Sequence, residues 1–232
     1  MISIIIPTYN EESCIETALQ SVLRHSNEAT IEVLVSDGNS EDRTVEIATK
    51  YAEVISGTRG RAKQLNRAAH FARGDTLFFL HADAILPKGA LRQIDQKVKV
   101  EGYDGGGFSN TFSSHNTKIK FLGRLMNFRI RDNDHTGNTV FFGDNGIFVR
   151  KSVFQALNGF RDMPIMEDYD FSTRMKRAHR VTRILEPQLL VSPRRHLKAG
   201  FLKTRLQWIV IKRLHQAGVP TELLSQWYIN VR

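Results

Sequence analysis

The chain has 232 residues, of which 41% are hydrophobic, and its 33 Lys and Arg against 24 Asp and Glu give a formal net charge of +9. This length suits one large domain, or one domain with a terminal extension. The single cysteine, Cys14, excludes an internal disulfide and a cysteine-based zinc cluster, and we expect a small buried residue there rather than a nucleophile. No stretch reaches the roughly 18 to 20 apolar residues of a membrane span. Because the first apolar run, Ile2–Ile6, is also too short for a signal peptide, we expect a cytoplasmic protein.

The basic charge is concentrated in the carboxyl-terminal part of the chain. From Phe171 to the end there are 13 Lys and Arg and 2 acids, a net of +11, which leaves 20 and 22, a net of −2, for the first 170 residues. Such a segment favours one of three partners: nucleic acid, an anionic membrane surface or a phosphorylated ligand.

Four apolar runs alternate with helical patterns over the first hundred residues. Consecutive apolar residues are typical of strands that are buried on both faces. The expected strands are Ile2–Ile6, Ile31–Val35, Glu53–Ser56 and Leu77–Leu80. The first expected helix covers Ile15–Leu23, with Glu11 and Glu12 in its first turn. The other expected helices are a segment capped by Ser40 or Asp42, Ala62–Ala69, and Pro87 to about Val100. This alternation predicts an α/β fold with right-handed crossovers and a mostly parallel central sheet.

The alternation ends after Val100. A strand is expected after Gly105–Gly107, running to Phe112, and another over Thr182–Leu185, with extended chain to Val191. The expected helices are Lys118–Arg131, Ser152–Leu157, Met166–Ala178, Phe201–Leu214 and Glu222–Val231. We interpret residues 1–198 as one domain with two halves, over about 1–100 and about 101–198. Residues 199–232 form a basic helical extension.

Polar residues follow each of the first four strands. Tyr9, Asp37, Arg61 and Asp83 come after successive strands, and the carboxyl ends of parallel strands meet at one edge of the sheet, where open α/β sheets bind ligands. Each residue has a structural alternative, because Asp37 can belong to a turn, Asp83 can start a helix and Arg61 can be a solvated charge. Their joint position favours a shared ligand. His81 and Asp83, two residues apart at a strand end, suit a divalent cation and a phosphate.

Six blocks in this order carry a resemblance to a known family: IIIPTYNEE, VLVSDGNSEDRT, GRAKQLNRAA, GDTLFFLHADAILP, GDNGIFVRKSVF and MEDYDFSTRMKR. They resemble the ordered blocks of family 2 glycosyltransferases with the GT-A fold and span Ile2 to about Arg177, roughly three quarters of the chain. The resemblance implies a Rossmann-like, mostly parallel sheet with helices on both faces and a helical carboxyl-terminal extension. The short length and the His-Ala-Asp form most resemble a small bacterial subgroup, the radical-SAM/selenodomain-associated transferases, some linked to arsenosugar biosynthesis.

The resemblance implies a site for a nucleotide-diphosphate sugar of the UDP or GDP type. In such enzymes the tyrosine of the first block stacks on the donor base, and the aspartate after the second strand binds base or ribose, which here are Tyr9 and Asp37. The last aspartate of an Asp-x-Asp motif, here Asp83, holds Mg²⁺ or Mn²⁺ against the diphosphate. The chain departs from that motif at its first position, where His81 replaces a carboxylate and is not expected to bind the metal. The full set of expected donor-binding residues is Pro7, Thr8, Tyr9, Glu11, Asp37, Arg61, His81, Ala82 and Asp83.

The resemblance also implies a catalytic base. In inverting members it is the aspartate of the Glu-Asp pair, here Asp168, and a helix amino terminus favours its ionised form. Asp144 and Glu167 are expected near the acceptor or the sugar. The structural alternatives are helix capping for Asp168, a surface acid for Glu167 and an Asx turn for Asp144. Arg194–His196 supplies either a diphosphate contact or a metal ligand, or is a plain basic loop.

Other readings of the chain remain open at this stage. A sugar nucleotidyltransferase would need a glycine-rich phosphate loop after the first strand, and PTYNEES is not one. A basic nucleic-acid-binding module fits the tail but not the acidic first part. The processive Gln-x-x-Arg-Trp motif is absent, so transfer of one sugar to an unknown acceptor is favoured. The segment from Phe201 to Leu214 resembles a basic amphipathic helix that lies peripherally on the inner face of a membrane, or packs on its own domain or a second subunit.

Overall fold

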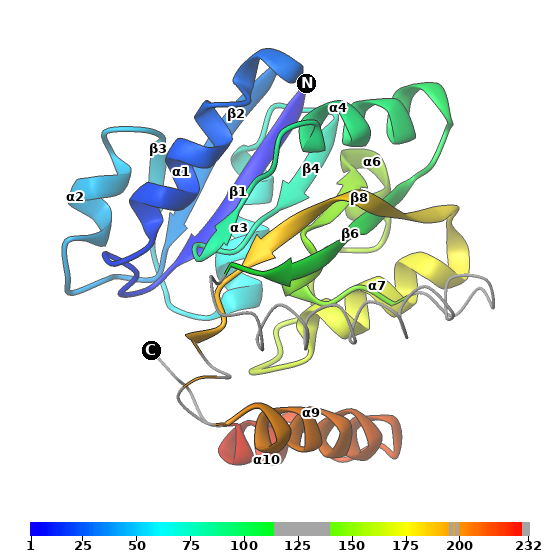
Figure 1. The fold of residues 1–232 in the computed structure, drawn as a ribbon. Helices are drawn as coiled ribbons and strands as arrows, with labels where there is room; N and C mark the ends of the chain where they lie inside the picture. Colours follow the sequence, from blue (N-terminus) through cyan, green and yellow to red (C-terminus); the bar gives the residue numbers. More distant parts are fainter. Residues whose placement is uncertain (114–139, 195–196, 198–199, 229–232) are drawn as a thin grey trace.

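The computed structural model describes residues 1–113, 140–194, 197 and 200–228. An eight-stranded sheet, in the order β3-β2-β1-β4-β7-β6-β8-β5, forms the centre, with helices on both of its faces (Figure 1). A pair of carboxyl-terminal helices lies beside this core as a separate layer. The helix expected over Lys118–Arg131 lies outside the described residues.

The first half of the chain follows the expected alternation. Its elements are β1 (Ile2–Thr8), α1 (Ile15–Leu23), a 3₁₀ turn (Ser26–Glu28), β2 (Ile31–Asp37), α2 (Thr44–Ala48), β3 (Glu53–Ser56), α3 (Arg61–Phe71), β4 (Thr76–Phe79), β5 (Ala84–Ile85), α4 (Ala90–Asp95) and a π-helical turn (Gln96–Val100). Strands β3, β2, β1 and β4 pair in parallel, as the sequence predicted.

The second half adds antiparallel pairs to this sheet. Its elements are β6 (Gly105–Phe112), a 3₁₀ turn η3 (Gly143–Asn145), β7 (Ile147–Arg150), α6 (Lys151–Ala156), α7 (Glu167–Ala178), β8 (Val181–Val191), α9 (Phe201–Gln216) and α10 (Thr221–Trp227). Strand β7 is antiparallel to β4 and β6, β8 is parallel to β6, and the short β5 is antiparallel to β8. Residues beyond Tyr228, including the end of the second expected tail helix, lie outside the described part of the chain.

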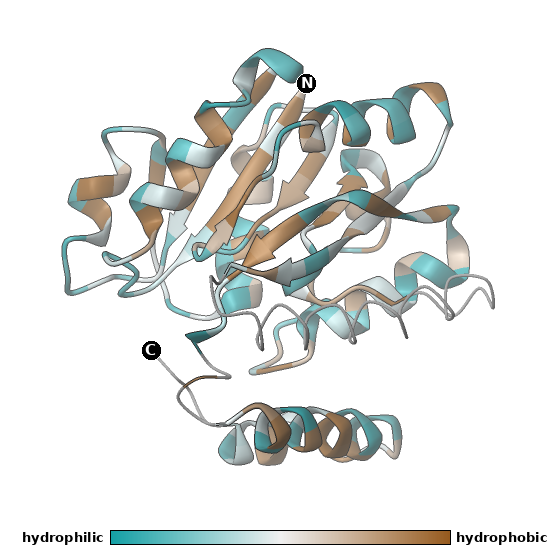
Figure 2. Ribbon diagram, viewed as in Figure 1, coloured by the Kyte–Doolittle hydropathy of each residue, from teal (hydrophilic) through white to brown (hydrophobic). Residues whose placement is uncertain are grey.

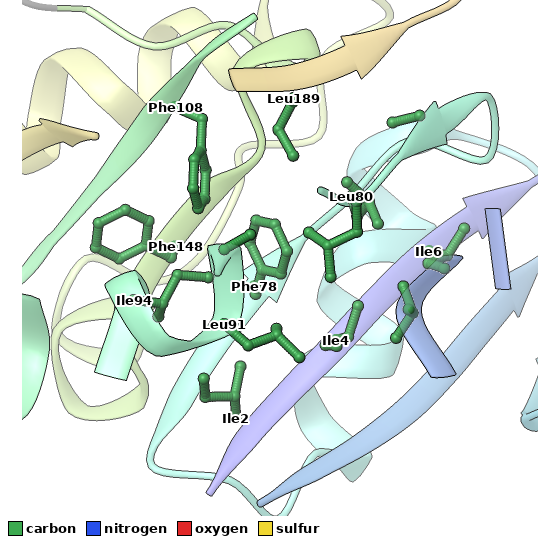
Figure 3. Close-up of a cluster of buried hydrophobic side chains, with 14 of the residues drawn as sticks. Ile2, Ile4, Ile6, Phe78, Leu80, Leu91, Ile94, Phe108, Phe148 and Leu189 are labelled. Carbon is green, nitrogen blue, oxygen red and sulfur yellow. The ribbon is translucent and has the colours of Figure 1, made fainter. Parts of the chain in front are cut away.

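Alternate residues of the central strands enter opposite layers of the core. Ile4 and Ile6 of β1, with Phe78 of β4, pack toward α1 and α4 (Figure 3). Ile5 and Leu77 point to the other face, where α3, α6 and α7 lie. Because both faces are covered, the central strands need apolar side chains at every position. This explains the unbroken apolar runs and the hydrophobic sheet in Figure 2.

The first turn of α1 and the start of α4 differ from the sequence expectations, whereas Asp42, one of the two residues expected before α2, does contact that helix. Helix α1 begins at Ile15 after a turn in which Glu11 C=O accepts a hydrogen bond from Cys14 N–H, so Glu16, not Glu11 or Glu12, lies in its first turn. Helix α4 begins at Ala90 rather than at Pro87, because β5 intervenes between Asp83 and the helix. Before α2, Asp42 Oδ1 accepts a hydrogen bond from Thr44 N–H at 3.0 Å, whereas Ser40 binds Asp37 instead of capping the helix.

Candidate active site

The loops after β1 and β2 are tied together at the carboxyl edge of the sheet. Thr8 Oγ1 donates to Asp37 Oδ1 at 3.0 Å, and Ser40 N–H donates to Asp37 Oδ2 at 2.8 Å. Asp37 is 1% exposed. The carboxylate predicted to bind the donor base or ribose therefore lies beneath the surface and orders the two loops around it.

Gln64 of α3 connects the helix to these two loops through its side-chain amide. Its Nε2 donates to Thr8 C=O at 2.7 Å and to Ser36 C=O at 2.8 Å. These carbonyl groups lie near the ends of two neighbouring strands, and one side-chain amide bridges them; Thr8 C=O also accepts a hydrogen bond from Gly38 N–H at 2.9 Å. Sequence reasoning missed this residue, although a glutamine beside Ala62 and Leu65 on the buried face of a helix is a signal that could have revealed it.

Tyr9 lies at the open rim of the same edge. The guanidinium carbon of Arg59 is 3.9 Å from the centroid of the Tyr9 ring, a cation–π contact. Arg59 comes from the glycine-flanked loop between β3 and α3. One face of the Tyr9 ring is thus in contact with a cation carried by the neighbouring loop.

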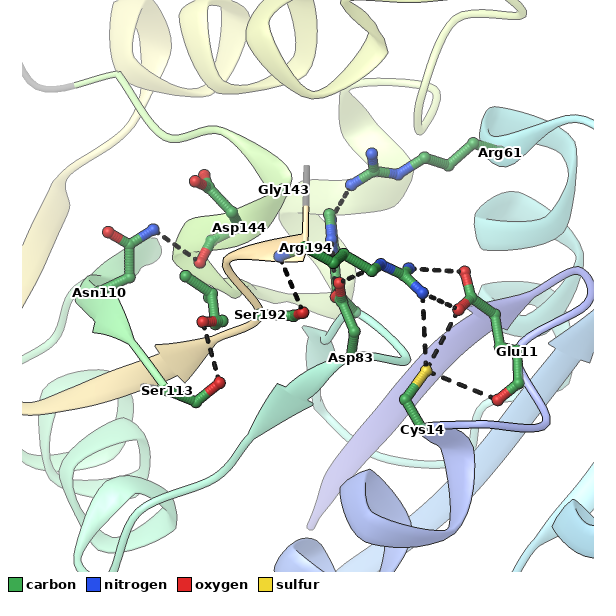
Figure 4. Close-up of polar contacts among 12 residues, drawn as sticks. Glu11, Cys14, Arg61, Asp83, Asn110, Ser113, Gly143, Asp144, Ser192 and Arg194 are labelled. Carbon is green, nitrogen blue, oxygen red and sulfur yellow. Dashed lines mark hydrogen bonds and ion pairs between the residues drawn. The ribbon is translucent and has the colours of Figure 1, made fainter. Parts of the chain in front are cut away.

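An arginine from the far end of the chain joins the loops after β1 and β4. Arg194 binds Glu11 through two nitrogens, at 2.8 and 3.0 Å, and its Nε lies 3.1 Å from Asp83 Oδ2 (Figure 4). The β5–β8 pair explains this contact, because Ala84 pairs with Val191 and so brings the chain after β8 beside Asp83. Burial raises the pKa of Asp83, and Arg194 opposes that rise.

Cys14 contacts the same group from the start of α1. Its thiol donates to Glu11 Oε2 at 3.2 Å. Burial, followed by the neighbouring Glu11 carboxylate, raises the pKa of Cys14 to about 12. The thiol therefore stays protonated at neutral pH, which excludes it as a nucleophile.

His81 and Arg61 connect the strand β4 edge to helix α7. His81 Nδ1 lies 3.9 Å from Asp83 Oδ1, and His81 Nε2 contacts Arg61 Nη2. Arg61 Nε lies 3.2 Å from Glu167 Oε1. A continuous row of charged and polar groups thus runs from Asp83 to the amino terminus of α7.

The first turn of α7 presents two adjacent carboxyl groups. Asp168 Oδ2 accepts a hydrogen bond from Gly143 N–H at 2.6 Å. Glu167 is 3% exposed, and burial, opposed by Arg61 and reinforced by Asp168, raises its pKa to about 7. A Cβ at position 143 would meet the ends of the Arg61 and His81 side chains, which would have to shift to make room for it. Gly143 therefore lets the turn η3 approach the row closely.

A small cavity lies among these groups. It has a volume of about 10 Å³, enough for roughly one water molecule. It is lined by Pro7, Arg61, Leu65, Phe79, Leu80, His81, Gly143, Ile147, Phe160 and Asp168. Four of the predicted site residues, Pro7, Arg61, His81 and Asp168, are thus brought together.

The other predicted residues are placed around this centre. Thr8 is buried against Asp37, and the side chain of Ala82 belongs to the apolar core, so only the backbone of Ala82 is available to a ligand. Asp144 is exposed on the turn η3, where its C=O accepts a hydrogen bond from Asn110 (Figure 4). Arg195 and His196 lie outside the described residues.

The donor groups suit a cation that is shared with a ligand. Among the described residues, no three His, Cys, Asp or Glu side chains are grouped to hold a metal ion. Asp83 offers one carboxylate, and its Oδ2 already attracts the Arg194 cation. Mg²⁺ and Mn²⁺ commonly bind to one or two carboxylates and complete their coordination with substrate phosphates, and the donor set here fits that arrangement.

Comparison with known proteins assigns the family. Residues 3–157 match the model of the family described as Glycosyl transferase family 2. The chain belongs to this family. This membership favours a glycosyltransferase over the nucleotidyltransferase and the nucleic-acid-binding module.

Curated relatives from bacteria and archaea match about half of the chain. Poly(ribitol-phosphate) β-N-acetylglucosaminyltransferase TarS of Staphylococcus aureus is 30% identical over 124 residues, which are 45% of this chain and 22% of that protein. Glycosyltransferase AglD of Haloferax volcanii is 29% identical over 115 residues, 44% of this chain and 18% of that protein. The matched segment therefore spans only about a fifth of the length of each relative.

Solved structures confirm the GT-A fold expected for the family 2 glycosyltransferase. The crystal structure of S. aureus TarS 1–349 has a TM-score of 0.67 at 20% identity and covers 83% of this chain and 61% of that chain. The mannosyltransferase PcManGT of Pyrobaculum calidifontis, in complex with GDP-Man and Mn²⁺, has a TM-score of 0.67 at 18% identity and covers 93% and 64%. At these identities the likeness extends to the fold alone.

Proposed function

We propose that this family 2 protein is a metal-dependent, inverting glycosyltransferase that moves one sugar from a nucleotide-diphosphate sugar to an acceptor hydroxyl. The observation that carries the proposal is the row from Asp83 through His81 and Arg61 to the first turn of α7. It sets a carboxylate suited to a metal-bound diphosphate at one end and Asp168, a carboxylate suited to proton transfer, at the other.

Asp168 is the proposed general base. Its Oδ2 accepts the hydrogen bond from Gly143 N–H, and the residue lies in the first turn of α7. Asp168 takes the proton of the acceptor hydroxyl as that oxygen forms a bond to the anomeric carbon. The bond between the anomeric carbon and the diphosphate oxygen breaks on the opposite side, and its electron pair leaves with the nucleoside diphosphate.

Asp83 is the proposed ligand of Mg²⁺ or Mn²⁺. A bound divalent ion would neutralise charge on the diphosphate leaving group. Arg194 lies beside Asp83 and Arg61 beside His81, so both add fixed positive charge along the row. His81 takes no part as a metal ligand in this proposal, since its Nε2 faces Arg61.

The nucleoside part of the donor is assigned to the loops after β1 and β2. Tyr9 stacks on the base. The base lies either on the face of the Tyr9 ring that Arg59 contacts or on the opposite face. Asp37 acts on base or ribose mainly by holding Thr8 and the loop around Ser40 in place. Pro7, Glu11 and the backbone of Ala82 complete the donor side. Asp144 and Glu167 face the sugar or acceptor, with Glu167 holding Arg61.

Structural relatives support a UDP or GDP donor. TarS has been solved in complex with UDP-GlcNAc, and PcManGT in complex with GDP-Man and Mn²⁺. We also propose that the protein belongs to the radical-SAM/selenodomain-associated subgroup and is located in the cytoplasm. Within the described residues, no helix is both long and apolar enough to cross a bilayer.

Calorimetric titration of the full chain with UDP, GDP, CDP and dTDP, with and without Mn²⁺, tests the donor site. We expect one of the four nucleotides to bind, and its affinity to rise when Mn²⁺ is present. If none of them binds in either condition, the proposed donor site is wrong.

A further inference from the structure

The carboxyl-terminal helices α9 and α10 have an inner face that packs on the core. Ile211 and Leu224 are buried, and with Trp208 they cover Met166 and Tyr169 of the α7 amino terminus. Gln216 Nε2 donates to Tyr169 Oη at 2.8 Å. The sequence left open whether this segment packs on its own domain, and the inner face shows that α9 does so.

The opposite face of the pair is also apolar. Leu202, Leu206, Ile209 and Val210 follow one another at intervals of four, three and one residues, which places them on the side of α9 away from Thr204, Trp208 and Ile211. The exposed fractions of the outer residues are 69% for Leu202, 53% for Leu206, 49% for Ile209, 47% for Val210, 53% for Leu223 and 60% for Trp227. A surface helix normally turns polar residues outward, so this outer face needs a partner.

A groove runs between the two helices on that outer face. It has a volume of about 610 Å³ and is open to solvent. It is lined by Leu202, Lys203, Leu206, Gln207, Val210, Ile211 and Trp227. Trp227 at its edge is an aromatic residue of the kind that is enriched where apolar and aqueous phases meet.

The charges along α9 are of one sign. Lys203, Arg205 and Arg213 lie along this helix, Lys212 Nζ lies over the Tyr169 ring on its inner side, and the helix has no Asp or Glu. Figure 2 shows hydrophobic and hydrophilic residues alternating along it. Glu222 is the only acid in α10. Two copies of this face would bring cations together, which disfavours self-association. An anionic surface complements the same charges.

We propose that the outer face of α9 and α10 docks on an anionic lipid bilayer. Leu202, Leu206, Val210 and Trp227 enter the boundary between headgroups and acyl chains, while Lys203 and Arg213 pair with lipid phosphates. The inner face keeps its contacts with Tyr169 during docking, so the helix pair lies flat between the membrane and α7. This docking is independent of the sugar transfer proposed above.

Vesicle flotation of the full chain tests the docking. Two kinds of vesicle are compared: phosphatidylcholine alone, and an equal mixture of phosphatidylcholine and phosphatidylglycerol. We expect flotation with the mixed vesicles and its loss in high salt. Equal binding to both kinds of vesicle, or binding to neither, would overturn the proposal.

Exposed positions allow variants that leave the core intact. The double variant Leu206→Glu, Val210→Glu should lower the affinity for mixed vesicles by more than about tenfold, and Lys203→Glu or Arg213→Glu by about fivefold or more. Val100→Glu is the control, because Val100 is 79% exposed outside this face, and it should bind as the wild type does. Circular dichroism and the thermal midpoint confirm folding of each variant.

Sedimentation equilibrium separates lipid docking from a second copy of the chain. We expect the wild type to remain monomeric in the absence of vesicles. A dimer that Leu206→Glu, Val210→Glu dissociates would assign the outer face to self-association and contradict the lipid proposal.

Tryptophan fluorescence gives an independent signal, because vesicles should shift the emission to shorter wavelength in Trp208→Phe but much less in Trp227→Phe.

Discussion

Arg194 and Asp83 come from opposite parts of the chain, yet Arg194 Nε lies 3.1 Å from Asp83 Oδ2. The same guanidinium group binds the Glu11 carboxylate through two nitrogens, and Glu11 is only 7% exposed. One cation thus holds two carboxylates that follow different strands. Removal of the Arg194 side chain should therefore lower the stability of the domain even in the absence of a ligand.

We expect Arg194→Ala to lower the free energy of unfolding by about 1–3 kcal/mol, since the Glu11 carboxylate would remain largely buried without its charged partner. Chemical denaturation measures the change. Arg43→Ala is the matched control, because the Arg43–Glu46 pair is exposed on both sides and such pairs contribute about 0–1 kcal/mol. An equal loss in the two variants would show that the buried pair has no special role.

Gln64→Leu should also destabilise the domain. Leucine has a similar size but leaves the carbonyl groups of Thr8 and Ser36 without the amide donor. We expect a loss of about 1–3 kcal/mol in the free energy of unfolding, together with weaker nucleotide binding, because the loops after β1 and β2 lose their common anchor. Gln96→Leu, at an exposed position, should change neither quantity.

Glu167 makes the stability depend on pH. Its pKa is raised from 4.5 to about 7 in the folded protein, so the folded state binds a proton more tightly than the unfolded state does. The contribution of this group to the free energy of unfolding is therefore fully present below pH 4.5 and is lost as the pH rises through about 7, by on the order of 3 kcal/mol.

Comparison with Glu167→Gln isolates this titration. The amide cannot ionise, so the unfolding free energy of Glu167→Gln relative to the wild type should increase from below pH 4.5 to above pH 7. Denaturation of the two proteins across this range gives the difference directly. A difference that does not vary with pH would mean that Glu167 keeps an ordinary pKa despite its burial.

Asp83→Asn should remove the effect of metal on nucleotide binding. The amide keeps the shape of the side chain but provides no negative charge for a divalent ion. We expect the gain in nucleotide affinity on addition of Mn²⁺, measured by calorimetry, to fall by about tenfold or more relative to the wild type. Asp75→Asn, an exposed control near the start of β4, should retain it. An unchanged gain in Asp83→Asn would assign the metal elsewhere.

Much of the fold was predictable because the strands are buried on both faces. Ile4, Ile5 and Ile6 must all be apolar when helices cover both sides of β1, and the resulting run is visible in the sequence. The boundaries of α1 and α4 were less accurate. The two-residue strand β5 has no pattern of its own, and it exists because β8, far along the chain, provides its partner.

The site was predictable to a smaller extent. Arg61, which was expected to share a ligand with Tyr9, Asp37 and Asp83, lines one cavity with His81 and Asp168, and the other three residues are not among its lining residues. The contact of Arg194 with Asp83 depends on the β5–β8 pairing, which periodicity does not reveal. The burial of Asp37 and the dual role of Gln64 likewise depend on how two loops close over each other. Such contacts are properties of the folded chain rather than of any local segment.

Asp168→Asn tests the central claim most directly. The measurement is the turnover number for consumption of the nucleotide sugar identified by binding, at saturating donor and Mn²⁺. We expect the variant to bind the nucleotide as the wild type does and to lose turnover by about 10²- to 10⁴-fold, as removal of a general base does. Asp162→Asn, an exposed control that precedes α7, should keep full activity. Turnover by Asp168→Asn equal to that of the wild type would contradict the proposed mechanism.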